Sequence, residues 1–180
     1  MSGGAKTDPA ALAAEWIAAR DTIRERGLPP DVLPVEELRG YSGLEFFQKM
    51  MRGEIPPPPI AQTLDFSLVE AEKGRVVFQG HPGRAHYNPI GSVHGGYHAT
   101  LLDSCLGCAV QSCLEAGQGY TTIELKVNYL RALSDRVGPV RAEGRAIHVG
   151  KQIGTAEARL FDASGRLYAH ATTTCLIFPI

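Results

Sequence analysis

One acidic residue stands out because of its surroundings. Asp103 is the only formal charge between Tyr97 and Leu114, a stretch otherwise rich in Leu, Ala, Val and Cys. A helix that is apolar nearly all round is a buried helix, and a carboxylate inside one is costly unless it is paired or used. Such a carboxylate can act as a general base or as a nucleophile. The alternative is a structural carboxylate that pairs with a backbone or arginine group.

A polar, glycine-rich segment stands directly before this apolar stretch. It reads Asn88-Pro-Ile-Gly-Ser-Val-His94-Gly95-Gly96. A helix that begins at Gly95 offers unpaired backbone N–H groups and the positive end of its dipole, and these groups stabilise a developing oxyanion. We therefore expect the Gly95 N–H to be an oxyanion donor. Because Gly95 and Gly96 lack side chains, an acyl group can approach them closely.

Two side chains of this segment have both a chemical and a structural interpretation. Asn88 can hold a carbonyl or orient water, but Asn before Pro is also a common turn residue. His94 can brace the loop by hydrogen bonding, which does not exclude a role in catalysis. His94 and His98 are four residues apart, as zinc-binding histidines on a helix would be, yet Gly95 stands where a metalloprotease carries its glutamate. We predict no metal site.

The spacing between the oxyanion donor and the carboxylate predicts an oligomer. Eight residues separate Gly95 from Asp103, which is about 12 Å along a helix that rises roughly 1.5 Å per residue. One chain cannot bring both groups to the same carbonyl. If both act on one carbonyl, Asp103 must come from a second copy, which predicts a two-fold homodimer or a dimer of dimers.

The chain is predicted to have two parts that meet at Pro56-Pro-Pro-Pro59. Residues 1–55 form an N-terminal helical extension. Asp8 is an N-cap with Pro9 at the first helical position and Gly27 as the stop, and Ser42-Gly-Leu-Glu45 is a capping box for a shorter helix that ends at Gly53. We expect these helices to pack against the second part or, alternatively, to bind a partner.

Residues 56–180 have the pattern of a sheet with one helix. Period-two alternation at 64–68 and 76–78 predicts two strands, and the apolar stretch predicts a helix from about Gly95 to Ala116. Alternation then predicts four strands, at 123–129, 139–149, 153–161 and 167–178. This order predicts an α+β fold in which an antiparallel sheet curls around the helix.

Taken together, these features resemble the hotdog-fold acyl-CoA thioesterases of the phenylacetate-pathway (PaaI-like) group. The likeness is carried by the pattern Asn-x5-His-Gly-Gly-x6-Asp, here Asn88, His94, Gly95, Gly96 and Asp103. Segments 122–131, 138–144 and 165–170 support it. The resemblance covers roughly residues 56–180, and it implies the hotdog fold for this second part.

The resemblance also implies a function and further site residues. It implies hydrolysis of an aryl or medium-chain acyl-CoA in active sites shared between protomers, with no cofactor because coenzyme A is part of the substrate. Thr122 would help to place the water or the carboxylate. Arg131 and the turn His148-Val-Gly150-Lys151 are candidates for binding the CoA phosphates, although exposed basic residues are commonly only solvated.

Two other functions compete with thioester hydrolysis. One is a dehydratase or isomerase of the same fold that acts on acyl-carrier thioesters, but the His-Gly-Gly spacing matches the hydrolases better. The other is a noncatalytic acyl-CoA sensor with residues 1–55 as a DNA-binding or partner-binding arm. Acidic residues outnumber basic ones in that arm, which speaks against DNA.

Composition limits the partners and the compartment. A formal net charge of −1 provides no field that would attract nucleic acid or an anionic membrane. Polar residues interrupt the apolar stretch too often for a membrane span, and no signal peptide is visible, so we expect a cytoplasmic protein. Cys105, Cys108 and Cys113 suit core packing better than a disulfide framework, and no second pair completes a zinc site with Cys105-x-x-Cys108.

Overall fold

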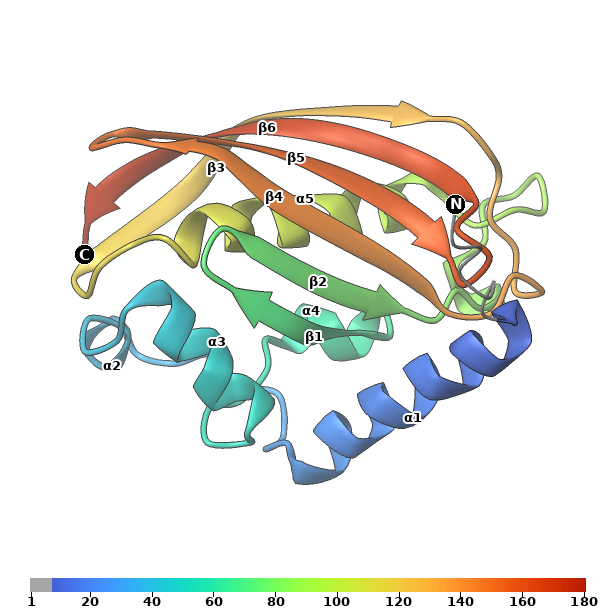
Figure 1. Ribbon diagram of the computed structural model, residues 1–180, viewed down its shortest axis with the longest axis horizontal. Coiled ribbons are helices and arrows are strands. Elements are labelled where there is room, and N and C mark those ends of the chain that lie inside the picture. The colour runs from blue at the N-terminus through green and yellow to red at the C-terminus, as the bar shows by residue number, and fades with distance from the viewer. Residues whose placement is uncertain (1–7) are drawn as a thin grey trace, which may run out of the picture.

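The computed structural model describes residues 8–180 as a curved sheet with a long helix on its inner face (Figure 1). All neighbouring strands pair antiparallel, in the order β1-β2-β4-β5-β6-β3. The strands are β1 Phe66–Glu72, β2 Arg75–Gly80, β3 Gln118–Tyr129, β4 Val140–Val149, β5 Ile153–Asp162 and β6 Leu167–Pro179, and the long helix is α5 Gly95–Gln111. The predicted α+β hotdog architecture is confirmed.

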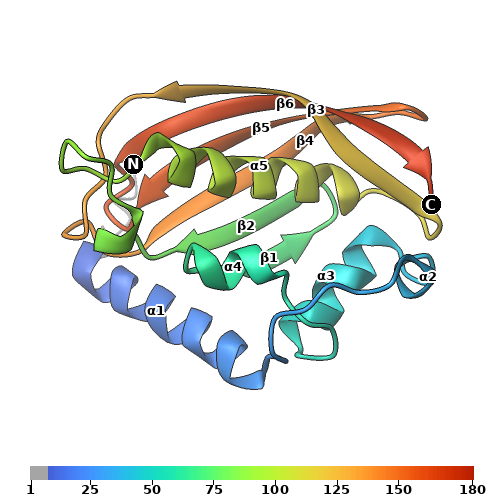
Figure 2. The same ribbon diagram turned by 180° about the vertical axis from the view of Figure 1, so that it is seen from behind.

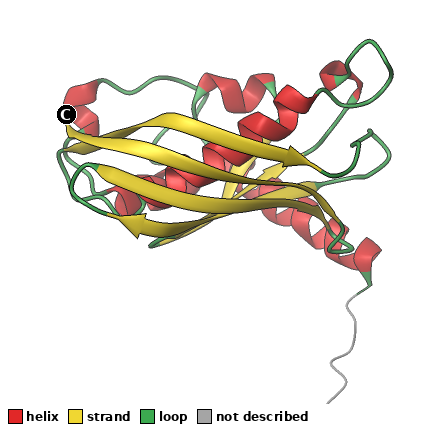
Figure 3. Ribbon diagram, turned by 90° about the horizontal axis from the view of Figure 1, so that it is seen from above, coloured by secondary structure: helices red, strands yellow, loops and turns green. Residues whose placement is uncertain are grey.

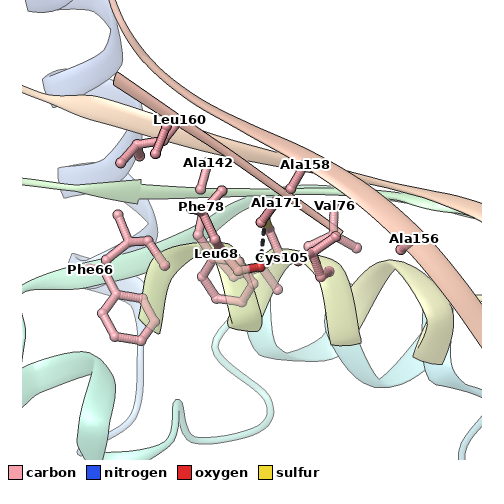
Figure 4. Packing of buried hydrophobic residues seen from close by; sticks show 14 of the residues in the cluster. Phe66, Leu68, Val76, Phe78, Cys105, Ala142, Ala156, Ala158, Leu160 and Ala171 are labelled. Carbon is pink, nitrogen blue, oxygen red and sulfur yellow. Dashed lines mark hydrogen bonds between the residues drawn. The ribbon is translucent and has the colours of Figure 1, made fainter. Parts of the chain in front are cut away.

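Small residues on the strands allow α5 to lie close against the sheet. A Cβ atom added at Gly144 of β4 would overlap the backbone oxygen of Cys105. Alanines from β4, β5 and β6 lie on the same inner face of the sheet (Figure 4). Phe66 of β1 and Phe78 of β2 are among the larger side chains of the core. The side chains of the sheet are therefore small where α5 packs on it, and one face of α5 is buried along its whole length.

Several predicted boundaries were wrong. The first strand begins at Phe66 rather than at residue 64, because Leu64 is the C-cap of the short helix before it. Helix α5 ends at Gln111 rather than near Ala116. Ser112 ends it, because the Ser112 hydroxyl donates to the Ala109 carbonyl at 2.7 Å and accepts from the Gly74 N–H at 2.8 Å. Strand β3 begins at Gln118, five residues before the predicted start, because its first residues pair with the end of β6.

Four helices precede the sheet (Figure 2). Both predicted helices are present: the Asp8 side chain caps α1 by accepting from the Ala10 N–H, and Ser42 caps the shorter helix by accepting from the Glu45 N–H. Two short helices and a 3₁₀ turn were not predicted. The helices are α1 Pro9–Arg26, α2 Val35–Leu38, α3 Gly43–Met51 and α4 Pro59–Thr63, and the 3₁₀ turn η1 spans Arg84–His86.

The N-terminal helices cover the β1 side of the sheet. The centre of the Trp16 ring of α1 lies 4.3 Å from the Arg141 guanidinium. The backbone oxygen of Trp16 accepts a hydrogen bond from the buried Gln79 side chain at 3.0 Å. Phe47 of α3 belongs to the main core. The division of the chain at residue 56 stays a prediction, since these contacts join the two parts. No helix within residues 8–180 is long and apolar enough to cross a membrane.

The opposite edge of the sheet is formed by β3 and is left open (Figure 3). Within residues 8–180, β3 pairs only with β6, along a register that runs from Gln118 to Tyr129. Ile123 and Tyr129 of this strand are 56% and 53% exposed. Long apolar edge strands are usually covered or paired.

Candidate active site

The start of α5 presents one backbone donor that has no partner. His94 is the N-cap residue, and its Nδ1 accepts a hydrogen bond from the Gly96 N–H at 2.8 Å. The His94 N–H donates to the His86 carbonyl at 2.8 Å, which holds the loop in place. The Gly95 N–H has no acceptor among residues 8–180. It is therefore free to donate to a ligand at the positive end of the helix dipole.

The Asp103 carboxylate lies at the middle of α5, on the side that faces β3. Its Oδ1 accepts a hydrogen bond from the Thr122 hydroxyl at 2.9 Å. The register of β3 against β6 shifts between Thr122 and Glu124, and such bulges re-aim side chains. Asp103 is half-buried in the isolated chain rather than fully enclosed. The contact with Thr122 holds one oxygen of the carboxylate in place.

The carboxamide of Asn88 is engaged by its own loop. Its oxygen accepts from the N–H groups of Ile90 and Ser92, each at 3.1 Å, and its nitrogen donates to the Ser92 hydroxyl at 3.0 Å. These contacts form the turn that precedes Val93 and His94. They match the turn-making interpretation of Asn88, and they leave the oxygen with no free lone pair for orienting water.

A shallow hollow of about 310 Å³ opens beside Gly95. Tyr129 of β3 forms one wall, because its hydroxyl donates to the Gly95 carbonyl at 3.2 Å and its ring lies 3.3 Å from where a Cβ atom at Gly95 would stand. Arg131 lines the hollow too, although its Nη1 donates to the Leu167 carbonyl. The full lining is Val93, Gly95, His98, Tyr129, Leu130, Arg131 and Ala132.

Sequence reasoning missed Tyr129 and His98 as site residues. The alternation of β3 placed Tyr129 on a strand, but only the fold shows that the strand ends beside Gly95. His98 was considered only as a partner of His94 for zinc. Its position one turn after Gly95 in the same helix is the signal that could have found it.

The predicted phosphate-binding residues are not all together in one chain. Arg131 lies near the start of α5, whereas His148, Gly150 and Lys151 belong to the turn between β4 and β5. That turn is closed by a bond from the Gly150 N–H to the Ile153 carbonyl at 2.8 Å, and the adjoining Gly154 packs against Val110 near the end of α5. A single chain therefore separates the two groups by most of the length of the helix.

A cysteine near Asp103 is not a competing nucleophile. Burial raises the pKa of the Cys108 thiol to about 12, although a hydrogen bond to Tyr120 opposes that effect. The thiol is therefore protonated at neutral pH, and the thiol form is a poor nucleophile. Burial also raises the pKa of Cys105 well above its ordinary value. These cysteines belong to the packing between α5 and the sheet.

A second cavity of about 280 Å³ lies on the other side of the molecule. It is mostly apolar and is enclosed by α1, α3, α4 and β1, with Met50, Met51 and Phe66 in its walls. None of the predicted site residues line it. The Arg24 guanidinium at this cavity is already bonded to Asp65 and Ser67, so it offers no free charge to a ligand.

Comparisons with known proteins identify the family of this chain. The thioesterase superfamily model matches residues 90–169, the segment that holds Gly95, Asp103, Thr122 and Arg131. A phenylacetic acid degradation-related protein from Ralstonia eutropha JMP134 superposes with a TM-score of 0.66 at 30% identity, over 73% of this chain and 98% of that one.

Two further proteins share the similarity. A 1,4-dihydroxy-2-naphthoyl-CoA hydrolase from Listeria monocytogenes is 25% identical over 118 residues, which is 66% of this chain and 94% of that protein. A Streptococcus mutans UA159 protein, solved bound to acetyl-CoA, superposes with a TM-score of 0.58 at 27% identity, over 63% of this chain and 89% of that one. Because the family match includes the α5 segment and the likeness spans nearly the whole of related chains, this protein belongs to the thioesterase superfamily and is a thioester hydrolase.

Proposed function

We propose that the protein is an acyl-CoA thioesterase that hydrolyses an aryl or medium-chain acyl-CoA to the free acid and coenzyme A. The observation that carries the proposal is the free Gly95 N–H at the start of α5, with the Thr122-bound Asp103 carboxylate two turns along the same helix. A coenzyme A thioester as substrate is supported by the CoA hydrolase among the relatives and by the acetyl-CoA held by a structural neighbour.

The chemistry needs only the groups present in the site. The Gly95 N–H donates to the thioester carbonyl oxygen and stabilises the negative charge that develops there. Asp103 takes a proton from a water molecule as the water oxygen bonds to the carbonyl carbon, or it attacks that carbon directly. When the C–S bond breaks, the CoA thiolate leaves and takes up a proton. In the direct route, water then hydrolyses the resulting anhydride, which returns the Asp103 carboxylate.

A two-fold dimer along β3 would bring these groups together. Pairing Gly95 with Asp103 of the partner subunit places the two-fold axis beside Ala99, midway between them on α5. The same axis passes β3 near Leu125, midway between Tyr129 beside Gly95 and Thr122 beside Asp103. Both positions follow from one two-fold rotation, which would relate the α5 helices as well as the β3 edges of the two subunits. Ala99 is small enough to let the helices approach.

The same arrangement would complete the binding site for coenzyme A. The β4–β5 turn lies near the C-terminal end of α5. In the proposed dimer the two α5 helices run antiparallel, so the turn of one protomer lies on the same side of the axis as Gly95 of the partner subunit. His148, Gly150 and Lys151 of one protomer and Arg131 of its partner are then proposed to bind the CoA phosphates from two directions. Both sets are required, although they are separate in one chain.

The release of free thiol from a panel of acyl-CoAs tests the proposed activity. We expect benzoyl-CoA, phenylacetyl-CoA and hexanoyl-CoA to be hydrolysed with a higher kcat/KM than acetyl-CoA, because the apolar side chains of Val93, Leu130 and Ala132 line part of the hollow beside Gly95. Crotonyl-CoA is included to detect hydration of a double bond. Absence of thiol release from every ester, together with hydration of crotonyl-CoA, would move the assignment to the dehydratases.

Mixing two inactive variants tests the shared site. We expect Asp103→Asn and Gly95→Pro homodimers to be nearly inactive, and their mixture to recover about a quarter of the wild-type activity per chain. Half of the randomly mixed dimers are heterodimers, and each heterodimer has one site with both native groups. Activity is measured after unfolding and refolding the two variants together, and tagged subunits confirm the mixing. No recovery despite confirmed heterodimers would show that each chain works alone.

A further inference from the structure

The ring of His98 has a buried nitrogen with no hydrogen-bond partner. His98 lies in the first turns of α5 and is only 2% exposed, yet its Nε2 has no partner within residues 8–180. A buried polar atom without a partner costs free energy comparable to a lost hydrogen bond, so such atoms are uncommon unless a ligand uses them. The same histidine lines the hollow beside Gly95.

The other contacts of the ring fix its orientation. Nδ1 lies 3.4 Å from the His94 carbonyl oxygen, one turn earlier in the helix. The Tyr129 ring packs edge-on against it, with centroids 5.7 Å apart and an interplanar angle of 77°. With Nδ1 turned toward the helix backbone, Nε2 is the ring nitrogen left without a partner, in a side chain that lines the hollow.

The protonation of the ring follows from these contacts. A carbonyl oxygen can only accept, so Nδ1 carries the hydrogen that points to His94. Burial lowers the pKa of His98 below its ordinary value, although the bond to His94 opposes this, so the ring is neutral at neutral pH. Nε2 therefore presents a lone pair, and the group that complements it is a hydrogen-bond donor.

We propose that His98 is a substrate-binding residue that accepts a hydrogen bond from an N–H or O–H group next to the thioester. The inference rests on the proposed acyl-CoA thioesterase activity and assigns a recognition role within that site. Two parts of an acyl-CoA carry such a donor. One is the pantetheine amide nearest to the sulfur, which every CoA ester has, and the other is a hydroxyl on the acyl group.

Two variants of His98 separate the effect of its acceptor nitrogen from the effect of its ring packing. His98→Phe keeps an aromatic ring against Tyr129 but removes the acceptor, and His98→Gln restores an acceptor oxygen at nearly the same position. We expect His98→Phe to lower kcat/KM about tenfold to a hundredfold on substrates that carry the recognised donor, the effect of one buried hydrogen bond. We expect His98→Gln to recover most of that loss. If the Phe ring does not fit, His98→Leu removes the nitrogen at a smaller volume.

Four substrates identify the donor. Benzoyl-CoA and 4-hydroxybenzoyl-CoA differ by one hydroxyl, while the N-acetylcysteamine thioester of benzoate keeps the amide that S-propyl thiobenzoate lacks. A loss in His98→Phe on every substrate except S-propyl thiobenzoate assigns the donor to the amide. A loss confined to 4-hydroxybenzoyl-CoA assigns it to the hydroxyl.

The outcomes also separate this inference from the proposed function. An equal loss on all four substrates would indicate a purely structural role for His98 and overturn the inference, as would full activity of His98→Phe on all of them. Wild-type protein that hydrolyses none of the four, and neither phenylacetyl-CoA nor hexanoyl-CoA, would contradict the proposed function itself.

Discussion

Replacing Asp103 with asparagine is expected to lower kcat for acyl-CoA hydrolysis about 1,000-fold, within the range that general-base catalysis supplies. The asparagine has the same shape and can still accept from the Thr122 hydroxyl, which bonds Asp103 at 2.9 Å in the native chain. It has no basic oxygen that could take a proton and is a far weaker nucleophile. The measurement is steady-state thiol release with each of the preferred esters.

A second variant at the same contact separates the effect of losing the carboxylate from the effect of losing the hydroxyl that orients it. Thr122→Val keeps Asp103 but removes the hydroxyl that holds it, so we expect a loss of only about tenfold, consistent with one hydrogen bond to a charged group. Circular dichroism and gel filtration confirm the fold and assembly of both variants. Full turnover by a folded Asp103→Asn protein would reject the catalytic assignment.

Replacing Gly95 with proline is expected to lower kcat about 100-fold to 1,000-fold, the effect of removing one oxyanion donor. Proline has no N–H, and Gly95 is the first residue of α5, the position where proline fits best in a helix. His94 has φ −60° and ψ 139°, an extended conformation that a residue before proline favours. The variant therefore removes the donor and keeps the helix start.

Gly95→Ala is the matched control for this variant. Alanine keeps the N–H, and its Cβ atom meets the Tyr129 ring at 3.3 Å, as the proline Cβ would. We expect less than a tenfold loss for alanine, since the ring needs to move only a few tenths of an ångström. Equal activity losses in the alanine and proline variants would show that the Tyr129 contact, and not the missing N–H, is responsible.

The predictions that held depend on local patterns. Capping by Asp8 and Ser42 was recognised because an N-cap side chain bonds to a backbone N–H two or three residues away. Helix α5 and the strands followed from periods of 3.6 and 2 in the apolar residues. Helix α4 was missed because Pro56–Pro59 was interpreted only as a boundary, whereas Pro59 is the first residue of a helix.

Residues that act across the fold were harder to predict. Tyr129 is 34 residues from Gly95, and their hydrogen bond exists only because β3 returns alongside α5. The free Nε2 of His98 required its burial and the position of His94 to be known. Asn88 could have been either a catalytic group or a turn residue by type, and its bonds to Ile90 and Ser92 match the turn.

The amino-acid sequence by itself determined the helix that begins at Gly95, the carboxylate two turns later and the strands that flank them, because hydrogen-bonding patterns and side-chain periodicity act over a few residues. The family resemblance implied that Thr122 helps to place the carboxylate, and the structure shows the hydrogen bond. Tertiary structure alone decided that Tyr129 bonds Gly95 and that β3 is an edge strand. Those contacts join residues far apart in the chain, and their geometry depends on how the sheet curves around the helix.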